Sequence, residues 1–291
     1  MRSQSAMEYL MTYGWAILAI AIVMVSLYSL GIFNTALLAP KANPGACEVL
    51  RTASQASLAG QCTNMVPKYA AKLDGATSNI YIPSTTPVRA TGSFTVNVWS
   101  YYGVNAYDSG SPHGMVCAAD GSGLVLIGGT PPNSYGYHFD HVTNNGYSYF
   151  YTSTQAPLKK WTMYTFTYNA SNGTAILYLN GTELTSDVVG TDYQDIIQNN
   201  PSLYIGTCPG LGYFNGTMSN IQIYNRTLTV SDVNPLYKEG IGGAPIDIQH
   251  LIGWWPLNGD ARDYSGNNRN GNITNVAWSA SWYSTYTYPK S

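Results

Sequence analysis

The chain has 291 residues, of which only 10% are charged, and its formal net charge is −2. A protein that binds nucleic acid through its phosphates needs a basic face, so this composition excludes that class of partner. Hydrophobic residues make up 45% of the chain, and it contains 25 tyrosines. The polar surface must therefore come from Asn, Thr, Ser, Gly and Tyr. The length fits one all-β domain with appended segments.

The first forty residues contain a long apolar run. No charged side chain occurs between Tyr9 and Pro40, and Trp15–Phe33 is almost wholly apolar. Such a run is long enough to cross a bilayer as a helix and is too long for the centre of an ordinary secretory signal. Glu8 stands at the head of the run, where a carboxylate in lipid needs a cationic partner. We expect a membrane-inserted helix within residues 1–38.

The motif Ser3-Gln4-Ser5 with Glu8-Tyr9-Leu10 ahead of this run resembles the class III signal of archaeal type IV pilin-like proteins. The resemblance implies that a prepilin peptidase cuts between Ser3 and Gln4. The new amine of one copy would then pair with Glu8 of its neighbour in a filament of this chain or related pilins. A membrane-inserted precursor would become a cell-surface or extracellular filament. The alternative is an uncleaved single-pass anchor that never polymerises.

Residues 39–68 form a linker, because Pro40, Pro44 and Gly45 break the helix. The four cysteines follow the apolar run, and none has the C-x-x-C spacing of a zinc site. An even number of cysteines in an exterior domain indicates disulfides, with three possible connectivities. Closeness in sequence favours Cys47–Cys62, which leaves Cys117–Cys208.

From Tyr69 onward the hydrophobic pattern has a period of two, which is typical of strands. Asn180-Gly181 between two alternating segments predicts a hairpin. The only helical pattern is Thr229–Glu239, with Ser231 as its cap. Many short strands without a long amphipathic helix predict a β-sandwich. The predicted strands are Tyr69–Gly75, Asn79–Pro83, Gly92–Trp99, Gly114–Ala118, Gly123–Ile127, Tyr135–Val142, Tyr147–Ser153, Trp161–Tyr168, Thr174–Leu179, Leu203–Gly206 and Gly216–Tyr224.

The order of four motifs resembles the laminin-G-like, concanavalin A-type jelly roll. They are Leu73-Asp74-Gly75 with Tyr81-Ile82-Pro83, Gly92–Trp99, Trp161–Gly181, and Leu203–Gly206 with Phe214–Leu228. The resemblance covers residues 70–240. It implies a mainly β protein: a long N-terminal hydrophobic α-helix followed by a jelly-roll β-sandwich over 69–291.

The segment Leu251–Trp278 looks like the one that usually opens such a domain, yet it stands at the end of the chain. We expect residues 251–288 to fold back and supply permuted edge strands to the same sandwich. Donation of these strands to the next subunit is the alternative. The alternating aromatic residues of the tail, from Trp278 through Trp282 to Tyr288, predict a final strand.

Catalysis is not expected. Glycosidases that share this fold carry the motif Glu-x-Asp-x-x-Glu, because glycoside cleavage with retention needs two carboxylates about 5–5.5 Å apart. No such motif occurs here, and the acidic residues of 70–240 are scattered. His138, Asp140 and His141 do not predict a metal site either, because His141 would point to the opposite face of the strand.

Asp263, Asn267 and Asn268 are the candidate metal ligands. Oxygen ligands around a tight glycine turn suit Ca²⁺, and the jelly-roll resemblance implies a calcium ion near this position. Alternatively, these side chains close an Asx-type turn by bonding their own backbone.

Tyr147, Tyr149 and Tyr151 share one face of a predicted strand and are the candidate ligand-binding residues. Tyrosine rings stack on the apolar faces of sugars, so surface glycans are the expected ligands; core packing is the alternative. Six N-x-S/T sequons lie at predicted turns and are candidate glycosylation sites: Asn169, Asn172, Asn180, Asn215, Asn225 and Asn272.

Taken together, these features predict a cell-surface, pilin-like filament subunit whose jelly-roll head acts in adhesion or carbohydrate binding. The alternative is a membrane-anchored, lectin-like protein that does not polymerise.

Overall fold

The computed structural model describes residues 4–29, 45–63, 65–83, 92–102, 113–119, 121–127, 134–140, 147–191 and 202–289. The chain divides into two compact units, Met1–Lys41 and Ala42–Ser291.

In the first unit the structure describes the helix α1, over Gln4–Ser29. Its described side chains are exposed apolar groups on every side, such as Trp15, which is 71% exposed. In the part of the chain that the structure describes, no helix is sufficiently long and apolar to cross a membrane, in contrast to the transmembrane segment predicted over 1–38. Ser3 and the side chains of Gln4 and Glu8 lie outside the described residues.

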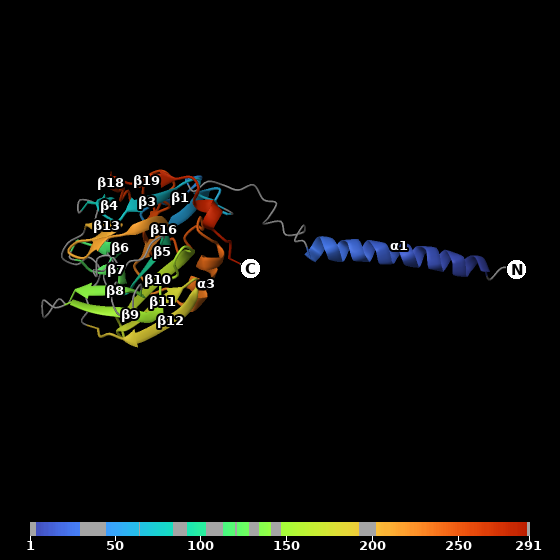
Figure 1. Cartoon of the computed structure of the whole chain (residues 1–291), viewed down its shortest axis with the longest axis horizontal. Coiled ribbons are helices and arrows are strands. Elements are labelled where there is room, and N and C mark those ends of the chain that lie inside the picture. Colours follow the sequence, from blue (N-terminus) through green and yellow to red (C-terminus); the bar gives the residue numbers. More distant parts are fainter. Residues whose placement is uncertain are drawn as a thin grey trace. The chain divides into compact units, whose positions relative to one another are not determined.

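The second unit is a β-sandwich of two antiparallel sheets (Figure 1), as the alternating sequence pattern predicts. Sheet I has the strand order β12-β11-β10-β5-β16-β3-β19, with β17 also paired to β16. Its strands are β3 (Ala70–Asp74), β5 (Phe94–Tyr102), β10 (Trp161–Asn169), β11 (Thr174–Leu179), β12 (Thr182–Val188), β16 (Asn215–Tyr224), β17 (Leu251–Trp255) and β19 (Ala277–Ser279).

Sheet II has the order β18-β4-β13-β6-β7-β8-β9, and the short strands β14 and β15 join it beside β6. Its strands are β4 (Asn79–Ile82), β6 (His113–Ala118), β7 (Gly123–Ile127), β8 (Ser134–Asp140), β9 (Tyr147–Gln155), β13 (Leu203–Ile205), β14 (Thr207–Cys208), β15 (Gly212–Tyr213) and β18 (Asn272–Thr274).

The main core lies between the two sheets. Residues at every second position of the strands enter it, such as Val96 and Val98 of β5 and Leu203 and Ile205 of β13. The alternate positions of β13, β4 and β6 therefore belong to the outer face of sheet II.

A second core covers the outer face of sheet I, and it explains why β5 and β10 are buried on both faces. Trp99 and Met163 of this face pack in one cluster with Trp254 and with Leu236 of the helix α3 (Val230–Lys238). The hairpin of β1 (Cys47–Arg51) and β2 (Ala56–Gly60) contributes Cys47 and Val49 to the same cluster.

The C-terminal segment pairs with strands of its own chain. β17 lies beside β16, β18 pairs with β4 at one end of sheet II, and β19 pairs with β3 at one end of sheet I. Figure 1 shows β18 and β19, in red, next to the blue-green β3 and β4. Residues 251–279 thus contribute to both layers of the sandwich.

Two local predictions are wrong. The N-cap residue of α3 is Thr229 and not Ser231. The carboxylate of Asp232 reaches back and accepts the Thr229 N–H at 2.9 Å, which forms a capping box at this position. Trp282–Tyr288 is not a strand: Trp282–Thr285 is a 3-10 helix that buries the Trp282 ring, whose Nε1 donates to the Pro67 carbonyl at 3.1 Å.

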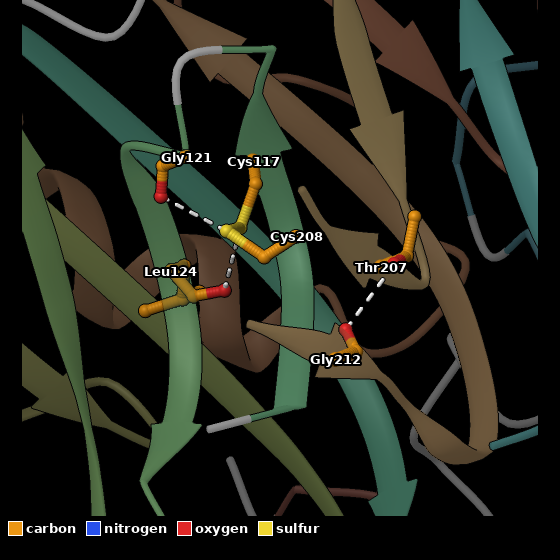
Figure 2. The surroundings of a disulfide bond; sticks show 6 residues. All are labelled: Cys117, Gly121, Leu124, Thr207, Cys208 and Gly212. Atoms are coloured by element: carbon orange, nitrogen blue, oxygen red, sulfur yellow. Dashed lines mark hydrogen bonds between the residues drawn. A yellow bond between two sulfur atoms is a disulfide. The ribbon is translucent and has the colours of Figure 1, made fainter. Parts of the chain in front are cut away.

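The cysteine pairing is confirmed. The disulfides join Cys47 to Cys62 and Cys117 to Cys208, with Cα–Cα distances of 4.9 Å and 5.2 Å. Figure 2 shows Cys117 on β6 joined to Cys208, the last residue of β14 in the tight β14–β15 hairpin. Next to the bridge, Thr207 Oγ1 donates to the Gly212 carbonyl at 3.2 Å and closes that hairpin.

Candidate functional site

Asp263 lies at the centre of the turn that follows β17, and its side chain is only 5% exposed. One carboxylate oxygen accepts the backbone N–H groups of Trp254 and Ser265, at 3.1 Å and 2.9 Å. The other oxygen accepts the N–H of Arg269 at 2.9 Å. Three backbone donors thus satisfy this carboxylate within its own turn, as in an Asx-type turn.

Two arginine side chains, Arg51 and Arg269, bind backbone carbonyls in and beside this turn. Arg51, at the end of β1, donates through Nε to the Ser265 carbonyl at 2.8 Å. Its Nη2 donates to the carbonyls of Ile248 and Leu251, at 2.7 Å and 2.6 Å. Arg269 donates to the Ile252 carbonyl. Burial lowers the pKa of the Arg51 and Arg269 guanidinium groups, and both still carry a positive charge at neutral pH.

These contacts compete with the calcium ion predicted at Asp263, Asn267 and Asn268, which stays a prediction. Calcium takes six to eight oxygen ligands, but the oxygens of Asp263 and the nearby carbonyls already accept hydrogen bonds. Asn267 turns its amide nitrogen toward Ser265 Oγ at 2.9 Å. Among the described residues, no group of three or more His, Cys, Asp or Glu side chains could hold a metal. Arginine side chains supply the positive charge of this region.

A pocket of about 200 Å³ opens beside the turn. Residues 48–51 of β1 line one wall, and residues of the turn 262–268 line the other. The two walls are tied by the Val49 N–H, which donates to the Tyr264 carbonyl at 2.9 Å. The sequence did not predict this pocket, because β1 and the turn are more than 200 positions apart.

Besides Arg51 and Asp263, which bind backbone groups, the pocket is lined by the carboxylate of Glu48, the guanidinium group of Arg262 and the ring of Tyr264. Arg262 Nη2 lies 3.2 Å from Glu48 Oε2, and its guanidinium carbon lies 5.2 Å from the centre of the Tyr264 ring. Asn268, with a φ of 58°, adds an exposed amide at the rim. This set offers hydrogen-bond donors, acceptors and a flat apolar surface within one small space.

The predicted tyrosine strand is β9. Tyr151 is 47% exposed, while its neighbour Phe150 enters the core between the sheets. The side chains of Tyr147 and Tyr149 lie outside the described residues, as do those of His138 and Asp140. Only Tyr151 is therefore placed as an accessible ring, and it belongs to β9, away from the strands that line the pocket.

The sequons fall into two groups. Asn172, Asn215, Asn225 and Asn272 are exposed, which an acceptor of a glycan requires. Asn169 and Asn180 are half-buried, and both use their side-chain oxygen inside the fold: that of Asn180 accepts the Met163 N–H at 2.9 Å.

Several acidic side chains outside the pocket have structural partners. Backbone N–H groups of Thr77, Ala76 and Ser78 hold the pKa of the Asp74 carboxyl well below its usual value. Arg226 bridges two further carboxylates, Asp232 and Asp247. Each of these groups closes a turn or fixes a segment.

A family model described as the concanavalin A-like lectin/glucanases superfamily matches residues 74–234. No curated protein sequence matches the chain.

Among solved structures, the chain resembles a Bacteroides ovatus protein assigned to carbohydrate binding, with a TM-score of 0.56 and 16% identity over 79% of this chain. The chain spans 64% of the length of that protein. A heptameric pentraxin from Limulus polyphemus has a TM-score of 0.48 and 11% identity, covering 72% of this chain and 94% of its own.

The fourth domain of an extracellular arabinanase from Geobacillus stearothermophilus, solved with arabinotriose, has a TM-score of 0.44 and 18% identity, covering 67% of this chain and 85% of its own. At 16% identity, the likeness to the Bacteroides ovatus protein shows a shared β-sandwich fold.

Proposed function

Because the chain belongs to the concanavalin A-like lectin/glucanases superfamily, we propose that its β-sandwich head binds carbohydrate without cleaving it. The observation that carries this proposal is the pocket between β1 and the turn 262–268. The Bacteroides ovatus protein of similar fold, which is assigned to carbohydrate binding, supports the ligand class.

The chemistry of the pocket suits a sugar. Sugar hydroxyls both donate and accept hydrogen bonds, so a carboxylate and a guanidinium side by side can each bind one or two of them. Glu48 and Arg262 supply this pair, and the ring of Tyr264 supplies an apolar surface for the C–H face of the sugar. The volume of about 200 Å³ holds a single sugar ring with its hydroxyl groups.

The carboxylates of the pocket do not form a hydrolytic pair. Cleavage of a glycosidic bond requires one carboxyl group as proton donor and a second as base or nucleophile. Glu48, which is partly exposed and paired with Arg262, could play one role, but both oxygens of Asp263 accept backbone N–H groups and the side chain is buried. We therefore expect binding without turnover.

The test is a glycan array probed with the full chain and with Arg262→Ala. Wild-type protein should bind a defined set of glycans, and Arg262→Ala should lose roughly tenfold or more in affinity for them. Lys238→Ala, an exposed change at the end of α3, is the matched control and should bind normally. A wild-type chain that binds no glycan, or that releases reducing sugar from one, would refute the proposal.

We further propose that α1 joins copies of the chain, or related pilins, into a surface filament. A helix that is apolar on every side needs a covering partner, and the exposed Trp15, Ile17 and Ile20 are examples of the surface to be covered. Together with the motif Ser3-Gln4 and Glu8, this supports cleavage by a prepilin peptidase and display at the cell surface. The second candidate, a lectin-like protein that stays a single copy, shares the same head.

The N-terminal mass of protein from its native cells distinguishes these candidates. A mature chain that begins at Gln4 and sediments as polymers supports the filament, and an intact Met1 on dispersed single copies supports the other candidate. Glu8→Ala should block polymer formation and leave the melting temperature of the head unchanged.

A further inference from the structure

The outer face of sheet II carries a pair of tyrosines that is separate from the pocket. Tyr81 of β4 and Tyr204 of β13 stand directly opposite each other in the antiparallel ladder. Their sequence neighbours Ile80, Leu203 and Ile205 are buried in the core, so the two tyrosines belong to the other face. Their ring centres are 5.0 Å apart with a tilt of 45°, and both side chains are half-buried.

The hydroxyl groups of this pair have polar neighbours. Tyr81 Oη lies 3.1 Å from Ser202 Oγ, at the start of β13. Burial, together with the nearby phenols of Tyr81 and Tyr213, raises the pKa of the Tyr204 hydroxyl. Tyr213 of β15 is a third half-buried tyrosine: its neighbour Phe214 enters the core, and β15 pairs with β6, which also pairs with β13. A phenol hydroxyl can donate or accept hydrogen bonds.

Charge is missing from the strands around the tyrosines. Strands β4, β6, β7, β13, β14, β15 and β18 contain no Asp, Glu, Lys or Arg. The rim of the patch is formed by amides instead. Asn79 is half-buried, and Asn272 of β18, which is exposed, stands opposite Tyr81 in the ladder.

We propose that Tyr81, Tyr204 and Tyr213 form a second carbohydrate-binding surface, which takes a neutral glycan. Aromatic rings offer flat apolar contact to the C–H face of a sugar ring, and the hydroxyls and amides beside them match its equatorial hydroxyl groups. Because the seven strands carry no charged side chain, they give no favourable electrostatics to a sialylated or sulfated chain. The inference rests on the proposed function of the head, and the surface shares no residue with the pocket of Glu48 and Arg262.

The experiment compares glycan binding by variants of the full chain. The protein is made in a bacterial host that forms disulfides but lacks N-linked glycosylation, so that no sugar on Asn272 covers Tyr81. A sugar-free, uncharged detergent keeps α1 in solution without competing for the site. The probes are an array of neutral, sialylated and sulfated oligosaccharides, followed by titration calorimetry with the neutral glycan that binds best.

Tyr81→Ala and Tyr204→Ala should each weaken binding of that neutral glycan by roughly tenfold. Tyr81→Leu and Tyr204→Leu fill the same space without a ring and should weaken it as much, so a poorly folded alanine variant does not end the test. Tyr81→Phe keeps the ring and should bind within about threefold of wild type. Tyr283→Ala, which removes a tyrosine that is 66% exposed in the C-terminal 3-10 helix, is the matched control and should bind normally.

The outcomes separate this inference from the proposed function. If wild-type protein binds no glycan at all, both are overturned. If Arg262→Ala abolishes binding of every glycan while the Tyr81 and Tyr204 variants bind as wild type, only the second surface is refuted. Binding restricted to sialylated or sulfated glycans would also refute the second surface and leave carbohydrate binding standing.

Discussion

Arg51 is the residue whose loss should most clearly reveal how the β1–β2 hairpin is held to the C-terminal turn. Its guanidinium donates to three carbonyls, those of Ser265, Ile248 and Leu251, at 2.6–2.8 Å. Arg51→Met keeps the apolar stem of the side chain but removes all three hydrogen bonds. Of the three acceptors, the Leu251 carbonyl keeps a second, longer contact with Asn267 Nδ2 at 3.4 Å.

The magnitude follows from these contacts. A hydrogen bond from a charged donor contributes about 1.5–3 kcal/mol, and three would exceed 4 kcal/mol if none were replaced. Arg51 is partly exposed, so water can take over some of its role. We therefore expect a loss of about 3 kcal/mol in the free energy of unfolding. For a unit of this size the melting temperature falls roughly 2–4 °C per kcal/mol, which predicts a decrease of about 6–12 °C.

Scanning calorimetry of the oxidised protein at pH 7 measures this decrease. Arg262→Met is the matched control, because it removes an exposed ion pair with Glu48 that contributes about 1 kcal/mol or less. Arg51→Lys should fall between wild type and Arg51→Met, since an ammonium group cannot reach three carbonyls in the geometry of the fork. A change of less than about 2 °C for Arg51→Met would refute the reasoning.

Three further predictions follow from the same structure. Millimolar calcium or EDTA should leave the melting temperature of wild-type protein unchanged, because arginine side chains already satisfy the carbonyls around Asp263; a calcium-induced rise of several degrees would contradict this. Burial alone would raise the pKa values of Asp232 and Asp247, but hydrogen bonds, among them those from Arg226, hold both below their usual range. These hydrogen bonds therefore stabilise the fold above pH ~4, and the stabilisation is lost as the pH falls through the lowered pKa values of the two carboxyl groups. We expect the urea midpoint of unfolding to decrease when the pH is taken below about 4, and to decrease less in Arg226→Met. Replacing both cysteines of the Cys117–Cys208 bridge, whose sequence separation is 91, by serine should lower the free energy of unfolding by about 4–5 kcal/mol in the chain-entropy model. The same change at the shorter Cys47–Cys62 bridge should lower it by about 3 kcal/mol. Equal urea midpoints for the two variants would argue against that model.

The strands of the sandwich were predictable because alternation is a local property. In Leu203-Tyr204-Ile205 the two apolar residues face the core and the tyrosine faces outward, as a period of two requires. The cysteine pairing also followed from the sequence, since two close cysteines left only one further pair. Alternation failed at Trp282–Tyr288, where the aromatic spacing serves a 3-10 helix that anchors Trp282 on the second core.

The chemistry of the candidate site was less predictable, because it depends on distant residues. The turn around Asp263 was visible in the sequence as oxygen-bearing residues beside Gly266, and that pattern suits a calcium ion and a closed turn equally well. What distinguishes the two is Arg51, which comes from a strand more than 200 positions earlier. No local spacing connects Arg51 to the carbonyls that it binds, so only the fold reveals the contact. The same distance hid the pocket between Glu48 and Arg262.

The strands β17, β18 and β19 have a consequence for how the protein is made. They follow all other strands of the two sheets in the sequence, yet one of them belongs to an end of each sheet and another is fully buried. The ribosome must therefore synthesise them before either layer of the sandwich can be completed. A premature stop anywhere before residue 251 would leave both layers without an edge strand.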